Sequence, residues 1–534
     1  MLRWQATFLF AFLLAQPLLA QTPVTEDQRF NFSGSIFSRA IFLARDLPLP
    51  SAPTTSGTRR SEQGYAEYYA CQINPGNCPD PSREKEQQDF YSIRLRVDAS
   101  YRLSPIADVL YGLEIGEIVF GRDERDRSGP GTGGQGSGRT NIETRQLMLL
   151  FHTARPDSSQ IAAGQAPPSF RAALRIGVFP VSSPEGLVLA ASGAGIRFDL
   201  EADDIDSKFR GIYIRSIDNA QIDSDSNGFS DENFSNINLG FVQWEWSRYR
   251  AFNPILYGLY RQDDDPSTAD LTDTVRETSR VYWGGLYLKF TFGPVGLILH
   301  GVGNWGRFHR PLSSDPDLAA AAADATDPLQ GFITEAVKPP LRRQYRINAG
   351  AGQVELSYKI SDDLELFLRG AGGSGRIPGD TEPDGSSVEF RPDQFRVANS
   401  GFQITEIAVG SSGGYGFLPG GRLTGIVATG LVAKYNFSIF ARAFVFELGF
   451  FNIDAYRTPT IDYNTSYTRT FNQNHPTNYL GSEWNTGLTW DVYADLTLDL
   501  RGAWFDAGSG YKTLLDSRYG DDIYEGQFSI THKF

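Results

Sequence analysis

One short polar segment carries oxygen ligands at the spacing that a calcium-binding loop requires. Asp223, Asp225 and Asn227 occupy every second position, and Gly228 permits a sharp bend. Carboxylate, amide and backbone oxygens arranged in this way can surround Ca²⁺. A turn rich in Asp, Asn and Ser in an acidic surface loop is the alternative. The predicted Ca²⁺ ligands are Asp223, Asp225, Asn227, Phe229 (through its backbone) and Asp231.

This segment resembles the calcium loops of EF-hand and dockerin-type repeats. It departs from them at the twelfth position, where Phe234 replaces the bidentate acid and Glu232 falls two places early. No helical pattern flanks it. Ca²⁺ is therefore the one cofactor that the sequence suggests, with the acidic turn left open beside it.

Histidines give little sign of catalysis. The five in the chain are His152, His300, His309, His475 and His532, and none stands in a recognisable nucleophile or metal-ligand motif. We expect no enzymatic activity, although residues that meet across strands would not show in sequence spacing.

The N-terminus has the pattern of a secretory signal peptide. Arg3 precedes the apolar run 8–15, and Ala20 ends a short stretch of small and apolar residues. We expect residues 1–20 to be removed and residues 21–534 to form a single domain. The run is too short to cross a bilayer as a helix, which needs ~20 residues.

Export also bears on the two cysteines. Cys71 and Cys78 enclose the turn-forming segment 72–77, which contains Pro75 and Gly76. An exported chain passes through an oxidising compartment, so we expect a Cys71–Cys78 disulfide that closes a small external loop.

The last eleven residues alternate between two faces. One carries Tyr524, Gly526, Phe528, Ile530, His532 and Phe534, and the other carries the polar residues Glu525, Gln527, Ser529, Thr531 and Lys533. A strand with lipid on one side and water on the other has this pattern. It resembles the closing strand of bacterial outer-membrane β-barrels, with His532 as a departure. The resemblance implies that Phe534 is the assembly signal and that the barrel-assembly machinery is a partner.

Connections between the alternating segments are by turns short and long, as in barrels with short periplasmic turns and long extracellular loops. Nine long polar segments predict an all-β, antiparallel transmembrane barrel of about 18 strands, with 154–170 as a rather long periplasmic connection. The long segments are 46–88, 121–139, 181–193, 218–233, 263–278, 310–341, 375–420, 454–480 and 507–521.

Short turns are placed where the alternation pauses. Ser104-Pro105 is predicted to join strands 91–103 and 109–115, and Tyr435-Asn436-Phe437 to reverse the chain between Val427 and Phe446. A soluble β-sandwich or propeller has similar patterns. The two chain ends decide between them in favour of a membrane barrel.

One long loop contains a predicted helix. Residues 316–325 combine Pro316 in the first turn with a run of alanines. Such a helix in segment 310–341 would either fold inward and narrow a pore or cover the rim from outside.

Parity along the strands assigns a set of charged residues to the face opposite the lipid. Arginine and lysine rings in a pore favour anions, and the alternative is that these charges pair with one another across strands. The predicted lumen residues are Arg94, Arg96, Asp98, Arg102, Arg175, Lys289, Arg346, Glu355, Lys359, Glu365, Arg369, Asp491, Asp499 and Arg501.

Overall composition fits this reading. Mean hydropathy is −0.31, as expected if half of each strand faces water, and the net charge of −14 argues against nucleic-acid binding. We expect outer-membrane lipids and small hydrophilic solutes as partners, and the outer membrane of a Gram-negative-type bacterium as location.

Three motifs carry a narrower resemblance: Arg175-Ile-Gly-Val, Gly195-Ile-Arg-Phe-Asp199 and Leu496 to Trp504. With about 18 strands and a basic lumen, the chain resembles alginate-export and related porins. The resemblance implies a channel for diffusion or export of small hydrophilic solutes, anionic or sugar acids. The alternative is a non-conducting surface barrel whose extracellular loops bind a partner, ligand or Ca²⁺.

Overall fold

The computed structural model describes residues 30–45, 86–104, 106–120, 142–153, 169–216, 236–249, 251–265, 277–311, 342–376, 392–398, 402–409, 423–458, 477–510 and 522–534. These residues contain 18 strands and two single-turn 3₁₀ helices, η5 (Pro184–Gly186) and η6 (Asp203–Ile205). The strands are β1 (Phe30–Arg45), β2 (Glu86–Ser104), β3 (Ala107–Phe120), β4 (Ile142–His152), β5 (Phe170–Ser182), β6 (Ala190–Ala202), β7 (Ser207–Ser216), β8 (Asn236–Trp246), β9 (Phe252–Asp265), β10 (Glu277–Phe292), β11 (Val295–Pro311), β12 (Arg342–Lys359), β13 (Leu364–Gly373), β14 (Ile426–Ile439), β15 (Arg442–Ala455), β16 (Tyr479–Tyr493), β17 (Leu496–Ala507) and β18 (Asp522–Lys533).

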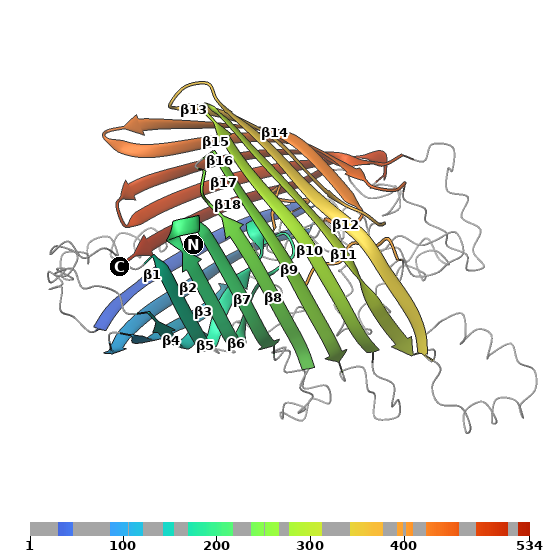
Figure 1. Ribbon diagram of the computed structural model, residues 1–534. Helices are drawn as coiled ribbons and strands as arrows, with labels where there is room; N and C mark the ends of the chain where they lie inside the picture. Colours follow the sequence, from blue (N-terminus) through green and yellow to red (C-terminus); the bar gives the residue numbers. More distant parts are fainter. Residues whose placement is uncertain are drawn as a thin grey trace, which may run out of the picture.

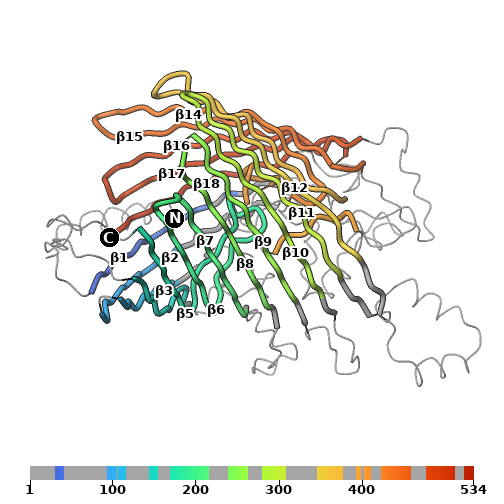
Figure 2. The backbone as a smooth tube through the Cα atoms, in the orientation of Figure 1, coloured from blue at the N-terminus to red at the C-terminus, as the bar shows by residue number. Residues whose placement is uncertain are grey.

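Every strand pairs antiparallel with its neighbours in sequence, and β1 also pairs with β18, so the sheet closes into a barrel. The strands tilt together around one wall (Figure 1), and β1 and β18 run side by side at the closure (Figure 2). Closure leaves no sheet edge unpaired, which a strand in lipid requires. The predicted all-β barrel of about 18 strands is confirmed.

Each of the nine predicted long segments falls between the predicted pair of strands, but the one between β5 and β6 is only 183–189, shorter than the connection between β4 and β5. One turn was placed wrongly. The chain reverses at Phe440 and Ala441, not at Tyr435-Asn436-Phe437, and β14 continues to Ile439. Phe440 and Ala441 both have positive φ, 51° and 58°, a conformation for which Gly or Asn is the usual signal.

The outer face of the wall is apolar and exposed. Leu431 is 61% exposed, Leu368 50% and Leu286 44%. So much apolar surface is compatible with lipid but not with water. Among the residues that the structure describes, no helix is long and apolar enough to cross a membrane. The exposed apolar face of the closed sheet makes its strands the membrane-spanning part.

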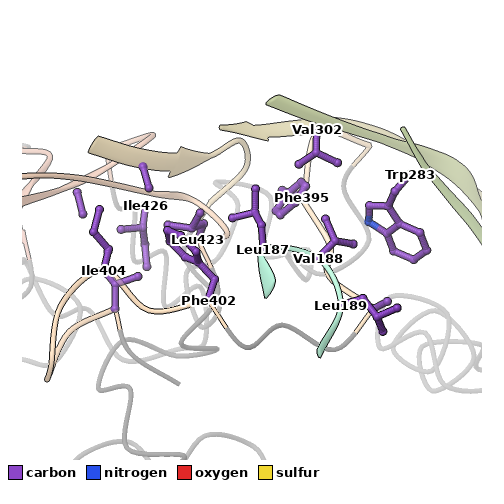
Figure 3. Packing of buried hydrophobic residues seen from close by; sticks show 14 of the residues in the cluster. Leu187, Val188, Leu189, Trp283, Val302, Phe395, Phe402, Ile404, Leu423 and Ile426 are labelled. Carbon is purple, nitrogen blue, oxygen red and sulfur yellow. The ribbon is translucent and has the colours of Figure 1, made fainter. Parts of the chain in front are cut away.

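Two stretches predicted as external loops fold into the barrel instead. Residues 183–189, 392–398 and 402–409, which we call the inward segments, pack against inward-facing wall residues and form a continuous buried cluster. Phe395, Leu187 and Val188 lie beside Val302 and Trp283 of the wall (Figure 3). The interior is thus partly filled at this level.

Several predicted features lie outside the described residues: the signal peptide 1–20, the Cys71–Cys78 pair, the helix 316–325 and the Ca²⁺ loop 223–231.

Candidate functional site

The inner face of the β2–β4 wall carries one carboxylate among three arginines. Glu114 on β3 accepts from Arg96 Nε on β2 at 2.7 Å and from Arg145 Nη1 on β4 at 2.7 Å, and Arg94 Nη1 lies 4.0 Å away. A bulge opposite Gly112 turns Arg145 toward the lumen. We call these four residues the Glu114 cluster; it has two more positive charges than negative ones.

The β5–β7 wall repeats this arrangement. Asp199 on β6 accepts from Arg175 Nη1 at 2.7 Å, from Arg197 Nε at 2.8 Å and from Arg210 Nε at 3.0 Å. Arg175 and Arg210 face Asp199 from the two neighbouring strands. These four residues are the Asp199 cluster. A single carboxylate cannot neutralise three guanidiniums, so this wall also has an excess positive charge.

On β12, β13 and β17, arginines and acids of the inner face pair with one another. Arg369 Nε donates to Glu355 Oε2 at 2.8 Å, and Arg501 Nε donates to Asp499 Oδ2 at 2.9 Å. The predicted cross-strand pairing therefore occurs here, while the excess of arginine is concentrated on β2 to β7.

The structure places thirteen of the fourteen predicted lumen residues on the inner face, because cross-strand partners share a face and the exposed apolar side chains mark the other one. They are Arg94, Arg96, Asp98, Arg102, Arg175, Lys289, Glu355, Lys359, Glu365, Arg369, Asp491, Asp499 and Arg501.

Arg346 is the exception, and its prediction is wrong. Its neighbour Ile347 is 4% exposed and belongs to the inner cluster, whereas Arg346 itself is exposed on the outer face. The pairing of β11 with β12 runs without interruption from Val295 to Pro311. Glu355 and Arg346 differ by an odd number of positions along β12, so their side chains must lie on opposite faces of the strand.

Residues 392–398 are anchored to the β9–β10 wall. Arg261 Nη1 donates to the carbonyl of Ala398 at 2.6 Å, and Trp283 Nε1 donates to that of Arg396 at 2.7 Å. Ala398 in turn donates its N–H to Val188 O at 3.0 Å, which ties residues 392–398 to the turn containing η5.

Residues 402–409 are held by one buried carboxylate. Glu483 on β16 is 0% exposed, and its two oxygens accept from the backbone N–H groups of Glu406, Ile407 and Ala408 at 2.8 to 2.9 Å. Arg501 on β17 donates to Glu406 Oε1 at 2.7 Å. Such charge-assisted bonds hold the loop against the wall.

Together the inward segments connect three parts of the wall: β5–β6, β9–β10 and β16–β17. They narrow the lumen. A helix in 310–341 was expected either to do this or to cover the rim from outside, and it lies outside the described residues; residues 183–189, 392–398 and 402–409 narrow the lumen here. The inward path was not visible in the sequence because Glu483 and Ala408 are 75 residues apart.

Glu114, Arg145, Arg197, Asp199 and Arg210 were missing from the predicted site list. Arg197 and Asp199 could have been found, because they alternate with Ile196, Phe198 and Leu200. Arg145 could not, because it stands in the bulge that shifts the alternation.

No group of three or more His, Cys, Asp and Glu side chains among the described residues could hold a metal ion. The predicted Ca²⁺ loop lies beyond those residues.

No protein-family model and no curated protein matches the chain, so the alginate-export resemblance is without support. Among solved structures, the chain is similar to OccK3 (OpdO) of Pseudomonas aeruginosa, at 12% identity over 94% of this chain and 96% of that one, with a TM-score of 0.45. OccAB2 of Acinetobacter baumannii gives 13% identity over 94% and 98%, with a TM-score of 0.44. OmpT, an outer membrane protein of Vibrio cholerae, gives 8% over 96% and 100%, with 0.37.

Likenesses at this level establish nothing about substrate or mechanism. The architecture by itself places the protein in the outer membrane, because closed antiparallel barrels with an exposed apolar band are the β-structures that span bacterial outer membranes. The chain is an 18-stranded transmembrane β-barrel of the outer membrane.

Proposed function

We propose that this barrel is a channel for passive diffusion or export of small hydrophilic solutes, with a preference for anions such as sugar acids. The observation that carries the proposal is the excess of arginine on one wall of the lumen. The Glu114 and Asp199 clusters each combine three arginines with a single acid.

Geometry supports a role for these arginines beyond structure. The side chains of Arg96, Arg145 and Arg210 are 35% to 39% exposed, so water and solutes reach them. Guanidiniums stay charged at neutral pH and bind carboxylates in a bidentate manner. An anionic solute passing the inward segments would exchange one arginine contact for the next.

The same clusters argue against a purely structural pairing. In the Asp199 cluster one acid faces three arginines, and like charges held this close repel each other unless an anion visits the site. The proposal therefore concerns transport and not catalysis. Outer-membrane lipids surround the barrel, and the barrel-assembly machinery is the proposed partner in its insertion.

A competing proposal is a non-conducting surface barrel, whose extracellular loops bind a partner, ligand or Ca²⁺. The buried cluster formed by residues 183–189 and 392–409 favours it, because a filled interior conducts poorly.

Planar-bilayer recording of the purified barrel separates the two. A channel gives discrete current steps that galacturonate reduces from either side, whereas a neutral sugar of equal size has a weaker effect. Absence of current steps in correctly folded protein would favour the surface barrel. Equal reduction by both solutes would leave a channel but reject its anion preference.

A further inference from the structure

An arginine row lies on the outer face of the barrel, where lipid would be expected. Arg280, Arg307 and Arg346 occupy adjacent positions in the register of β10, β11 and β12, and all three are exposed. Among the described residues, none of the three has a hydrogen-bond or ion-pair partner. Like charges side by side on a sheet are destabilising, so this row needs an anion.

Aromatic side chains lie next to the arginine row on the same outer face, two positions along the strands toward the membrane centre. Tyr282 and Trp305 flank the row on β10 and β11, with ring centroids 6.4 Å apart and planes 10° from parallel. Tyr260 of β9 continues the line at 4.9 Å from Tyr282. Amphipathic rings in a line around a barrel mark the level of the lipid headgroups.

The distance along the strand also places the arginine row at the level of the lipid headgroups. Arg280 stands about twelve residues from Phe292 at the short-turn end, which at ~3.3 Å per residue and a tilt of ~40° is a height of roughly 30 Å. The apolar band of such barrels is ~25 Å tall. The arginine row therefore lies just beyond the band, on the side of the long extracellular connections.

Toward the membrane centre, the same strands form a hollow in the lipid-facing surface. It has a volume of about 680 Å³, and outward-facing residues of β10 to β14 line it, among them Leu286, Gly301, Gly352 and Leu368. A Cβ atom added at Gly301 would meet nothing within 4 Å. The glycines thus leave an apolar depression in line with the arginine row.

We propose that this face binds one anionic membrane lipid, with its phosphate on Arg280, Arg307 and Arg346 and an acyl chain in the hollow. The combination selects the ligand, because a free phosphate has no use for the hollow and a neutral lipid has none for the arginines. Lys and Arg at a membrane surface attract anionic headgroups, and Arg suits phosphate oxygens in particular.

Native mass spectrometry of the full-length barrel in a neutral detergent tests the proposal. The probes are lipid A carrying two phosphates, the same lipid with both phosphates removed, and inorganic phosphate as competitor. The test variants are Arg307→Gln/Arg346→Gln for the headgroup and Gly301→Leu for the hollow. Arg248→Gln/Arg442→Gln is the matched control, since it removes two exposed arginines at the opposite, short-turn end.

Each arginine at a headgroup is worth roughly fivefold in affinity, so the double test variant should bind the phosphorylated lipid roughly thirtyfold more weakly. We expect Gly301→Leu to weaken it too, the control to leave it unchanged, and inorganic phosphate not to compete. Heat-modifiable migration verifies that each variant is folded.

Equal lipid binding by all variants would overturn the proposal. So would equal binding of the dephosphorylated lipid, or competition by inorganic phosphate at the lipid's own concentration. Loss of a dimer or trimer in Gly301→Leu, with lipid binding intact, would assign this face to a contact between copies of the chain.

Discussion

Replacing Glu483 by Gln should release the inward segment 402–409 from the barrel wall. The carboxylate accepts three backbone hydrogen bonds, from Glu406 and Ile407 to Oε1 and from Ala408 to Oε2. Glutamine has nearly the same shape but only one acceptor oxygen. Its NH₂ group would face an N–H donor in a site from which water is excluded.

The cost can be worked out from these contacts. With the amide oxygen toward Glu406 and Ile407, the bond to Ala408 is lost and two donors are left facing each other. A bond to a charged group is worth ~1.5–3 kcal/mol and a buried unsatisfied donor costs ~1–3 kcal/mol, so the segment loses about 3 to 5 kcal/mol. The strands keep their own hydrogen bonds, and the barrel itself should remain folded.

Hydrogen exchange of the 402–409 amides, read by mass spectrometry, measures this change. Since ~1.4 kcal/mol is a factor of ten, exchange should accelerate at least a hundredfold in the variant. Glu447→Gln is the control: Glu447 also faces inward but is partly exposed, with Lys434 Nζ at 3.7 Å as its ion-pair partner. There the loss should be below ~1 kcal/mol. Unchanged exchange in Glu483→Gln would refute the assignment of this carboxylate as the anchor.

Three further outcomes are expected. Deleting Phe534 should impair assembly, since its backbone exchanges two hydrogen bonds with Gly34, at 2.9 and 3.0 Å, where β1 meets β18; heat-modifiable migration of the truncated protein like that of the parent would contradict this. Cys71 and Cys78 should show no free thiol by intact mass, and a double Ser variant should still assemble, because the closed loop is small; failure to assemble would argue otherwise. Titration calorimetry should detect Ca²⁺ binding that Asp225→Asn weakens, and an absence of heat in the parent would leave segment 223–231 as an acidic turn.

The barrel could be predicted from the sequence because its signals are local. Alternation from Tyr524 to Phe534 and the spacing of the nine long segments define strands whose partners are their neighbours in the chain. The missed turn at Phe440 and Ala441 has an equally local cause, since neither residue is a usual one for positive φ.

Arg346 shows where parity reasoning fails. Alternation assigned Arg346 to the lumen because its neighbour Ile347 is apolar, but above the membrane band the inner face also becomes apolar, where it packs on the inward segments. An arginine can face outward there because lipid headgroups replace lipid tails. Residue type therefore indicates the face only within the band.

Contacts of the inward segments could not be predicted, because they join residues far apart in sequence. Arg261 and Ala398 are 137 residues apart, and Glu406 and Arg501 are 95 apart. Nothing in the local pattern of 392–409 distinguishes a loop that folds inward from one that remains outside. The sequence did indicate part of the arginine excess in the lumen, because Arg94, Arg96 and Arg175 were predicted there.

Reversal potential under a KCl gradient is the most direct test of an anion-preferring channel. The parent barrel should be anion selective. A variant with Arg96, Arg145, Arg175 and Arg210 changed to Gln should shift toward cations, because each cluster then retains its acid and loses two positive charges. A cation-selective parent, or a reversal potential that the four substitutions leave unchanged, would contradict the account.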